Sequence, residues 1–153
     1  MLRISLCLLL CFPINAFSQK HLDKTKEEVK KELGKYVAAN SQLRPALTET
    51  DSTLVLSVTE QSQPASFVYG FDRTTGKCNY QQTKASCDSC YKKYLKTLLD
   101  QNVYRWKKIN ENQYVSAFEY QLLLELPAEA NEYSFILFKT QWTKELYDLL
   151  IKD

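Results

Sequence analysis

The chain is poor in glycine and nearly without histidine, and both shortages exclude classes of function. Three of its 153 residues are glycine, so it has no glycine-rich loop of the kind that cradles phosphate groups. Its one histidine, His21, leaves any serine or cysteine nucleophile without a well-placed imidazole base. The neighbouring carboxylates Glu27 and Glu28 fall at a predicted helix start, where capping accounts for them. We therefore expect no catalytic residues and no enzyme.

An excess of charge of either sign is also missing. Twenty Lys and Arg residues stand against eighteen Asp and Glu residues, a formal net charge of +2. Such a balance provides no basic surface for the phosphates of nucleic acid or for an anionic membrane. We therefore predict that the chain does not bind nucleic acid.

Long hydrophobic runs are absent apart from one near the N-terminus. There Arg3 precedes an apolar run that ends at Phe12, Pro13 breaks it, and small residues follow. This order is typical of a secretory signal peptide, and the run has about half the length that a bilayer-spanning helix needs. We predict a signal peptide at residues 1–18, a single domain at residues 19–153, no transmembrane segment, and export to the periplasm or the extracellular space.

Three cysteines remain after the predicted leader: Cys78, Cys87 and Cys90. An odd number in an exported protein implies one disulfide and one unpaired thiol, or an intermolecular bridge. A redox-active Cys-x-x-Cys pair is expected to follow a hydrophobic strand that ends at a helix start, but the segment before Cys87 is polar. We therefore favour a structural disulfide from Cys78 to Cys87 or Cys90, with reduced or mispaired thiols and a redox-active Cys87/Cys90 pair as alternatives. His21 lies far from these cysteines in the sequence, so we expect no metal site and no cofactor.

Hydrophobic spacing predicts helices and strands in alternating groups. Thr25 and Glu28 have capping-box spacing and Gly34 can end the helix they begin, whereas residues 37–52 are predicted as a loop. Strands are expected at 53–59, 65–72 and 77–83. A second helix, capped by Ser86 or Asp88, carries an apolar stripe; it consists of Tyr91, Tyr94, Leu95, Leu98 and Leu99.

Three or four further strands are expected between residues 103 and 140, and a third helix is expected from Trp142 onwards. Groups of strands joined by tight turns favour an antiparallel sheet. The predicted fold is α+β, with helices packed on one face of the sheet, in the order α-βββ-α-βββ(β)-α.

Two stretches resemble a known family: "TKEEVKKELG", which begins at Thr25, and "FDRTTGKC", which ends at Cys78. Together they are similar to the small exported domains of the SmpA/OmlA outer-membrane assembly lipoproteins and the beta-lactamase inhibitor proteins, over residues 22–83. The resemblance implies a non-catalytic domain that grips a protein on an aromatic-rich sheet face.

Aromatic residues are plentiful, with ten Tyr, seven Phe and two Trp. Large rings that stay exposed make effective contact residues. We name Tyr69, Tyr104, Trp106 and Tyr114 as candidate binding residues on the sheet face opposite the helices; the alternative is that these rings cover a second small core. The expected function is non-catalytic binding of a protein or envelope component, and the alternative is a thiol-active protein that uses Cys87 and Cys90. The sequence leaves the oligomeric state open.

Overall fold

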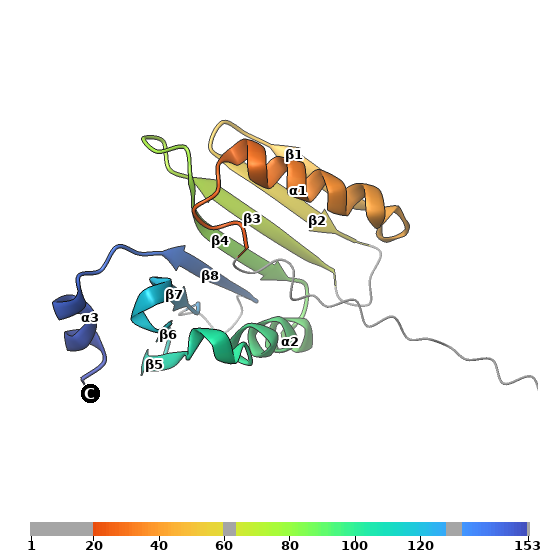
Figure 1. Cartoon of the computed structure of the whole chain (residues 1–153). Coiled ribbons are helices and arrows are strands. Elements are labelled where there is room, and N and C mark those ends of the chain that lie inside the picture. The colour runs from red at the N-terminus through yellow and green to blue at the C-terminus, as the bar shows by residue number, and fades with distance from the viewer. Residues whose placement is uncertain (1–19, 60–63, 128–132, 153) are drawn as a thin grey trace, which may run out of the picture.

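The fold is built on one antiparallel sheet, and the helices lie beside it (Figure 1). The computed structural model describes residues 20–59, 64–127 and 133–152. In these ranges the strands are β1 (Pro45–Glu49), β2 (Thr53–Val58), β3 (Ala65–Phe71), β4 (Cys78–Ala85), β5 (Lys107–Asn110), β6 (Gln113–Val115), β7 (Leu122–Glu125) and β8 (Ser134–Lys139). The helices are α1 (Lys26–Ala39), α2 (Asp88–Leu99) and α3 (Lys144–Leu150), with short 3₁₀ turns η2 (Ser41–Leu43), η3 (Asn102–Tyr104) and η4 (Phe118–Tyr120). The predicted α+β class with an antiparallel sheet is confirmed.

The sheet consists of two halves of the same design. Its order is β1-β2-β3-β4-β8-β7-β6-β5, so each half is a four-strand meander that starts at an outer edge and ends at the centre. A helix and a 3₁₀ turn precede each meander. The residue after each of these turns has a left-handed backbone, Arg44 with φ 43° and Arg105 with φ 48°. The match in element order that the sequence indicates therefore extends to local backbone geometry.

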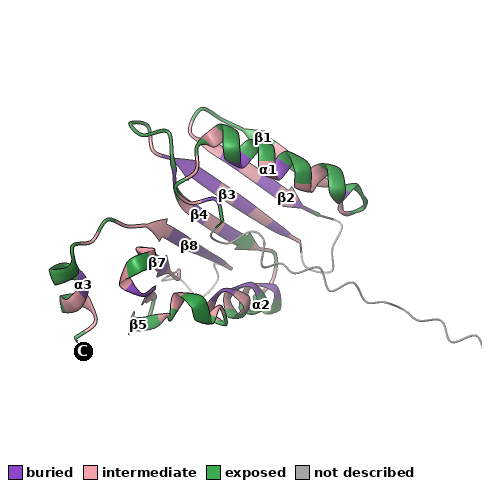
Figure 2. Cartoon of the chain, viewed as in Figure 1, coloured by how far each residue is buried: buried purple, intermediate pink, exposed green. Residues whose placement is uncertain are grey.

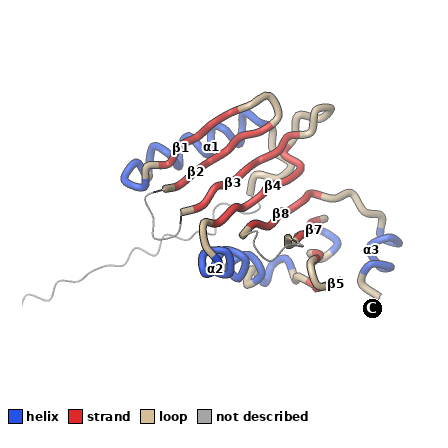
Figure 3. The backbone as a smooth tube through the Cα atoms, turned by 180° about the vertical axis from the view of Figure 1, so that it is seen from behind, coloured by secondary structure: helices blue, strands red, loops and turns tan. Residues whose placement is uncertain are grey.

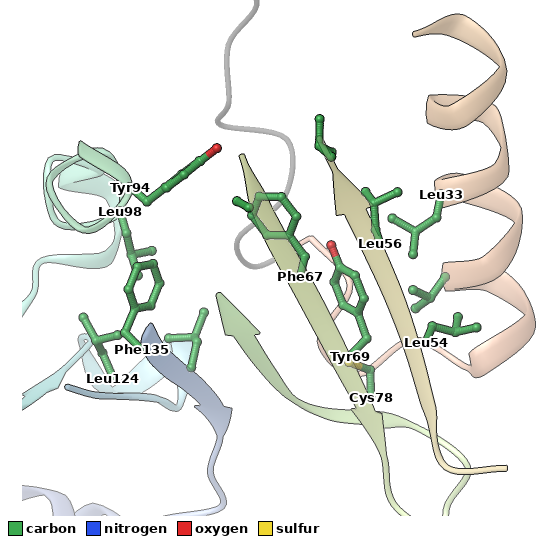
Figure 4. Close-up of a cluster of buried hydrophobic side chains, with 14 of the residues drawn as sticks. Leu33, Leu54, Leu56, Phe67, Tyr69, Cys78, Tyr94, Leu98, Leu124 and Phe135 are labelled. Atoms are coloured by element: carbon green, nitrogen blue, oxygen red, sulfur yellow. The ribbon is translucent and has the colours of Figure 1, made fainter. Parts of the chain in front are cut away.

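Helices α1 and α2 cover one face of the sheet, which we call the helix face. Figure 4 shows Leu33 of α1 beside Leu54 and Leu56 of β2, and all three are buried. On α2, Tyr94 and Leu98 are buried as well. The Tyr94 ring meets the ring of Phe67 on β3 edge to face, with 5.8 Å between their centres. A single core thus extends beneath both helices, and the exposed residues of α1 and α2 lie on their outer sides (Figure 2).

The sequence predicts three strands before the second helix, and the structure has four; the first helix also ends later than predicted. Helix α1 does not end at Gly34 but continues to Ala39, where Asn40 caps it. The predicted loop at 37–52 contains β1, which pairs with β2 through Leu47 and Leu56. Pro45 begins this edge strand, a position where its missing N–H leaves no ladder bond unmade.

The C-terminal helix α3 is anchored to the connection between β6 and β7. The Tyr147 hydroxyl donates a hydrogen bond to the Ser116 carbonyl at 3.0 Å. The Tyr147 ring also lies against the ring of Phe118, with centres 5.5 Å apart. Within α3, Tyr147 is buried whereas Leu146 and Leu149 are exposed.

Candidate functional site

The Cys-x-x-Cys pair forms a disulfide at the start of α2. Cys87 and Cys90 are bonded to each other, and Cys87 is the N-cap residue of the helix. The amide of Cys90 donates to Cys87 Sγ at 3.2 Å, and the Ser89 hydroxyl lies 3.2 Å from the same sulfur. Cys90 is 1% exposed, whereas Cys87 is partly exposed. The two sulfurs therefore differ in access to solvent.

The structural bridge predicted from Cys78 to Cys87 or Cys90 is wrong. Cys78 is a free, buried thiol at the first residue of β4, and Cys87 lies two residues beyond the last, Ala85. An eight-residue strand spans about 25 Å, while the Cα atoms of a disulfide lie within about 7 Å of each other. Burial raises the pKa of the Cys78 thiol to about 12. The observed bridge joins residues only three apart in sequence. Closing so short a loop in the unfolded chain stabilises the folded protein by at most about 2 kcal/mol.

The N-cap of α2 lies between the two residues that the sequence suggests for this position. Ser86 and Asp88 were the candidate caps, and Cys87 between them takes the position. Thiol sulfur is a weak acceptor, so cysteine is easily overlooked as a capping residue.

The prediction that Tyr69 lies on the open face of the sheet is wrong. Tyr69 is fully buried on the helix face, where its ring meets that of His21 edge to face at 5.2 Å. Its neighbours in β3 at two-residue spacing, Phe67 and Phe71, are buried on the same side. This period-two spacing was the signal in the sequence that places Tyr69 in the core.

The other three candidate binding residues also pack against the core. Tyr104, Trp106 and Tyr114 are partly buried and contact the core cluster. The Trp106 indole N–H donates to the Leu98 carbonyl of α2 at 3.1 Å, and Tyr114 pairs with the buried Leu124 across the ladder. These contacts correspond to the alternative in which the rings cover hydrophobic core.

A different set of side chains occupies the face of the sheet opposite α1, which we call the open face. Figure 3 shows this face, with the strands in front and α1 behind them. The register places six partly exposed apolar residues on it: Val55, Val68, Tyr80, Leu123, Ile136 and Phe138. The rings of Tyr80 and Phe138 face each other across β4 and β8, with centres 6.2 Å apart. These residues were missed because β8 is apolar at nearly every position, so its sequence does not show which side faces the helices.

Few charges lie among the six open-face residues. On β1, β2 and β3 the same face carries only small polar or apolar side chains, such as Thr53, Ser57 and Ser66. The charged residues of this face are Lys84 at the end of β4, Glu125 on β7 and Lys107 on β5. Lys107 reaches the Ile151 carbonyl beyond α3, so α3 borders the open face at the β5 edge.

The one histidine is buried beside α1 and contacts a partly exposed ion pair. His21 is 3% exposed, and its Nδ1 lies 3.2 Å from Oε2 of Glu32. Glu32 also accepts from the Lys24 ammonium at 2.6 Å. Burial lowers the pKa of His21 from 6.5 to about 4, against the opposing charge of Glu32. His21 is therefore a neutral core residue at physiological pH rather than an exposed side chain.

Within the described residues, no three His, Cys, Asp or Glu side chains gather at a distance suited to a metal ion. In the same ranges, no helix is both long enough and apolar enough to cross a bilayer. The predicted leader at residues 1–18 lies outside the described residues.

Comparison of the chain with protein-family models, curated proteins and solved structures found no match in any of the three. The resemblance to the SmpA/OmlA and beta-lactamase inhibitor group therefore stays a prediction.

Proposed function

We propose that this chain is an exported, non-catalytic binding domain whose contact surface is the open face of the sheet, and that its partner is a protein with an uncharged apolar patch. The observation that carries the proposal is the set of six partly exposed apolar side chains on strands that α1 and α2 leave uncovered, with Gln82 between Val68 and Ile136. Exposed apolar surface of this kind is typical of interaction sites.

The charge distribution favours a protein partner. Interface centres are depleted of charged residues and enriched in aromatic ones, and the open face has Tyr80 and Phe138 near its middle with Lys84 towards one end. A nucleic acid or an anionic membrane would require basic residues at the centre instead. The contact residues of this proposal replace the four aromatic residues predicted from the sequence.

The test places a charge at the centre of the open face. Val68 lies on β3 between Val55 and Gln82, and Val68→Glu puts a carboxylate there without opening the core. We expect the variant to lose the partner that the unmodified protein captures from envelope extracts, because a buried, unpaired charge is costly in an interface. Circular dichroism and the unfolding midpoint report whether the fold is kept.

A matched control is Gln42→Glu, which adds the same charge at an exposed residue of η2. This variant is expected to retain the partner. Equal loss of capture in both variants, or full capture by a folded Val68→Glu protein, contradicts the proposal.

A further inference from the structure

We propose that the Cys87–Cys90 disulfide is a thiol–disulfide exchange site, with Cys87 as the sulfur that is attacked and a dithiol of another exported polypeptide as the reactant. This inference does not require a partner bound at the open face, although the cavity beside the disulfide shares Ser57, Ser66 and Lys84 with that face. It rests on the bond itself, on its position at a helix start, and on the unequal access to its two sulfurs.

The position of the bond within one helical turn argues against a purely structural role. Structural disulfides stabilise by closing long loops of the unfolded chain, but this bond joins two residues of the same turn. It ties α2 neither to β4 nor to any other element. A bond with so little to stabilise can open and close without a change of fold.

The site directs attack to one sulfur. Cys90 is 1% exposed and Cys87 is partly exposed, so an incoming thiolate meets Cys87 first. A shallow cavity of about 310 Å³ adjoins the site and includes Ser86, the residue before Cys87. Pro64 lines the same cavity and its carbonyl accepts from the Ser86 amide at 3.2 Å. A partner chain lying in this cavity contacts Ser86, the residue that precedes Cys87 in the chain.

The helix start favours release of a Cys87 thiolate. The Cys90 amide and the Ser89 hydroxyl both point to Cys87 Sγ. Together with the partial positive charge at the N-terminus of α2, these donors stabilise negative charge on that sulfur. Stabilising the reduced form makes the disulfide a better oxidant.

The reaction balances as a two-electron exchange. A partner thiolate attacks Cys87 Sγ, the Cys87–Cys90 bond breaks, and Cys90 leaves with the electron pair and takes a proton from water. The second partner thiol loses its proton and attacks the partner sulfur of the mixed disulfide, and Cys87 leaves as a thiolate. The partner dithiol is oxidised to a disulfide, and Cys87 and Cys90 are reduced.

The first experiment equilibrates the purified protein with glutathione at a series of redox ratios, followed by alkylation and peptide mass spectrometry. We expect Cys87 and Cys90 to become alkylated together while Cys78 stays unmodified and circular dichroism is unchanged. Reduction that occurs only under conditions that unfold the protein overturns the proposal and indicates a structural bond.

The second experiment tests which sulfur reacts. Oxidised glutathione should form a mixed disulfide with Cys87 in Cys90→Ser at least about tenfold faster than with Cys90 in the matched Cys87→Ser variant, because exposure and the helix start favour Cys87. Equal rates in the two variants overturn the assignment. If either variant fails to fold, the rates of alkylation of Cys87 and Cys90 in the reduced, unmodified protein give the same comparison.

The third experiment mixes the oxidised protein with a synthetic peptide that contains two cysteines. One equivalent of peptide disulfide should form for each Cys87–Cys90 bond lost. Failure of the peptide to be oxidised, with glutathione exchange intact, overturns the proposed reactant class. All three results are obtained with purified protein and small thiol reagents and need no captured partner, so failure at this site and failure of capture at the open face are distinguishable.

Discussion

Gly70 lies directly beneath the ring of Tyr80 on the open face of the sheet. The two residues are partners across β3 and β4, and a Cβ atom built on Gly70 would stand 1.9 Å from Cε1 of Tyr80. The ring can lie flat against the strand because residue 70 has no side chain. Gly70 thereby holds Tyr80 in the position where it also meets Phe138.

Gly70→Ala is expected to displace the Tyr80 ring and lower the free energy of unfolding by about 1–2 kcal/mol, the usual cost of overpacking. In a Tyr80→Ala background the same substitution should be neutral or slightly stabilising, since glycine is a poor strand residue. Urea denaturation of the four proteins in this double-mutant cycle measures the coupling. An equal cost in both backgrounds would show that the Tyr80 ring is not the obstacle.

The burial of His21 makes stability depend on pH in the range where histidine titrates. The pKa of His21 is lowered from 6.5 to about 4 in the folded protein, so the unfolded chain binds a proton before the folded one does as the pH falls. Stability is therefore full above pH 6.5 and is lost as the pH falls towards 4. We expect the free energy of unfolding to decrease by about 2 kcal/mol between pH 7 and pH 5.

The interval down to pH 5 isolates the histidine from the acidic residues. The carboxylates of Glu32 and Glu49 have pKa values lowered from 4.5 by hydrogen bonds from lysines, so their contributions are lost only below that value. Denaturant titrations at both pH values, repeated with His21→Phe, provide the comparison. An unchanged pH dependence in a folded His21→Phe protein would show that another group is responsible.

The Tyr69 hydroxyl is buried without a hydrogen-bond partner among the described residues. A buried, unsatisfied hydroxyl is destabilising, so Tyr69→Phe is expected to be neutral or to stabilise the protein by up to about 1 kcal/mol. Tyr69→Ala should cost about 3–5 kcal/mol, because it empties a core site. Thermal unfolding of both variants tests this, and a clear loss of stability in Tyr69→Phe would reveal a partner for the hydroxyl.

The sequence predicts most of the fold because spacing reports which residues are buried. The stripe of α2 and the alternation of Leu54 and Leu56 in β2 both identify core residues correctly. The β1 strand escapes prediction because it is short and begins with Pro45. Gly34 leads to the opposite error, a helix predicted to end too early. The residues after it favour a helix, and no atom lies within 4 Å of where a side chain at Gly34 would be.

The candidate site is harder to predict, because it depends on which face of the sheet each side chain occupies and on the distance in space between the cysteines. Cys78 and Cys87 are close in sequence, but the chain between them is an extended strand. The same holds for the open face. In β8, Ile136 and Phe138 face the open side, whereas Phe135 and Leu137 face the core, and the pairing with β4 decides which is which. A run of apolar residues carries no information on that pairing.

Cys78 is expected to be inert in the folded protein. It is 1% exposed, and burial raises the pKa of its thiol to about 12, so almost no thiolate forms at neutral pH. An alkylating reagent should therefore modify Cys78 only when β4 separates from the segment before α1, where the Lys24 carbonyl accepts from the Cys78 amide. Its rate of modification should rise with urea in parallel with global unfolding, whereas that of a reduced Cys87 should hardly change. Rapid modification of Cys78 without denaturant would mean that the β4 end of the core opens locally, and the comparison with Cys87 in the same sample excludes a difference in reagent.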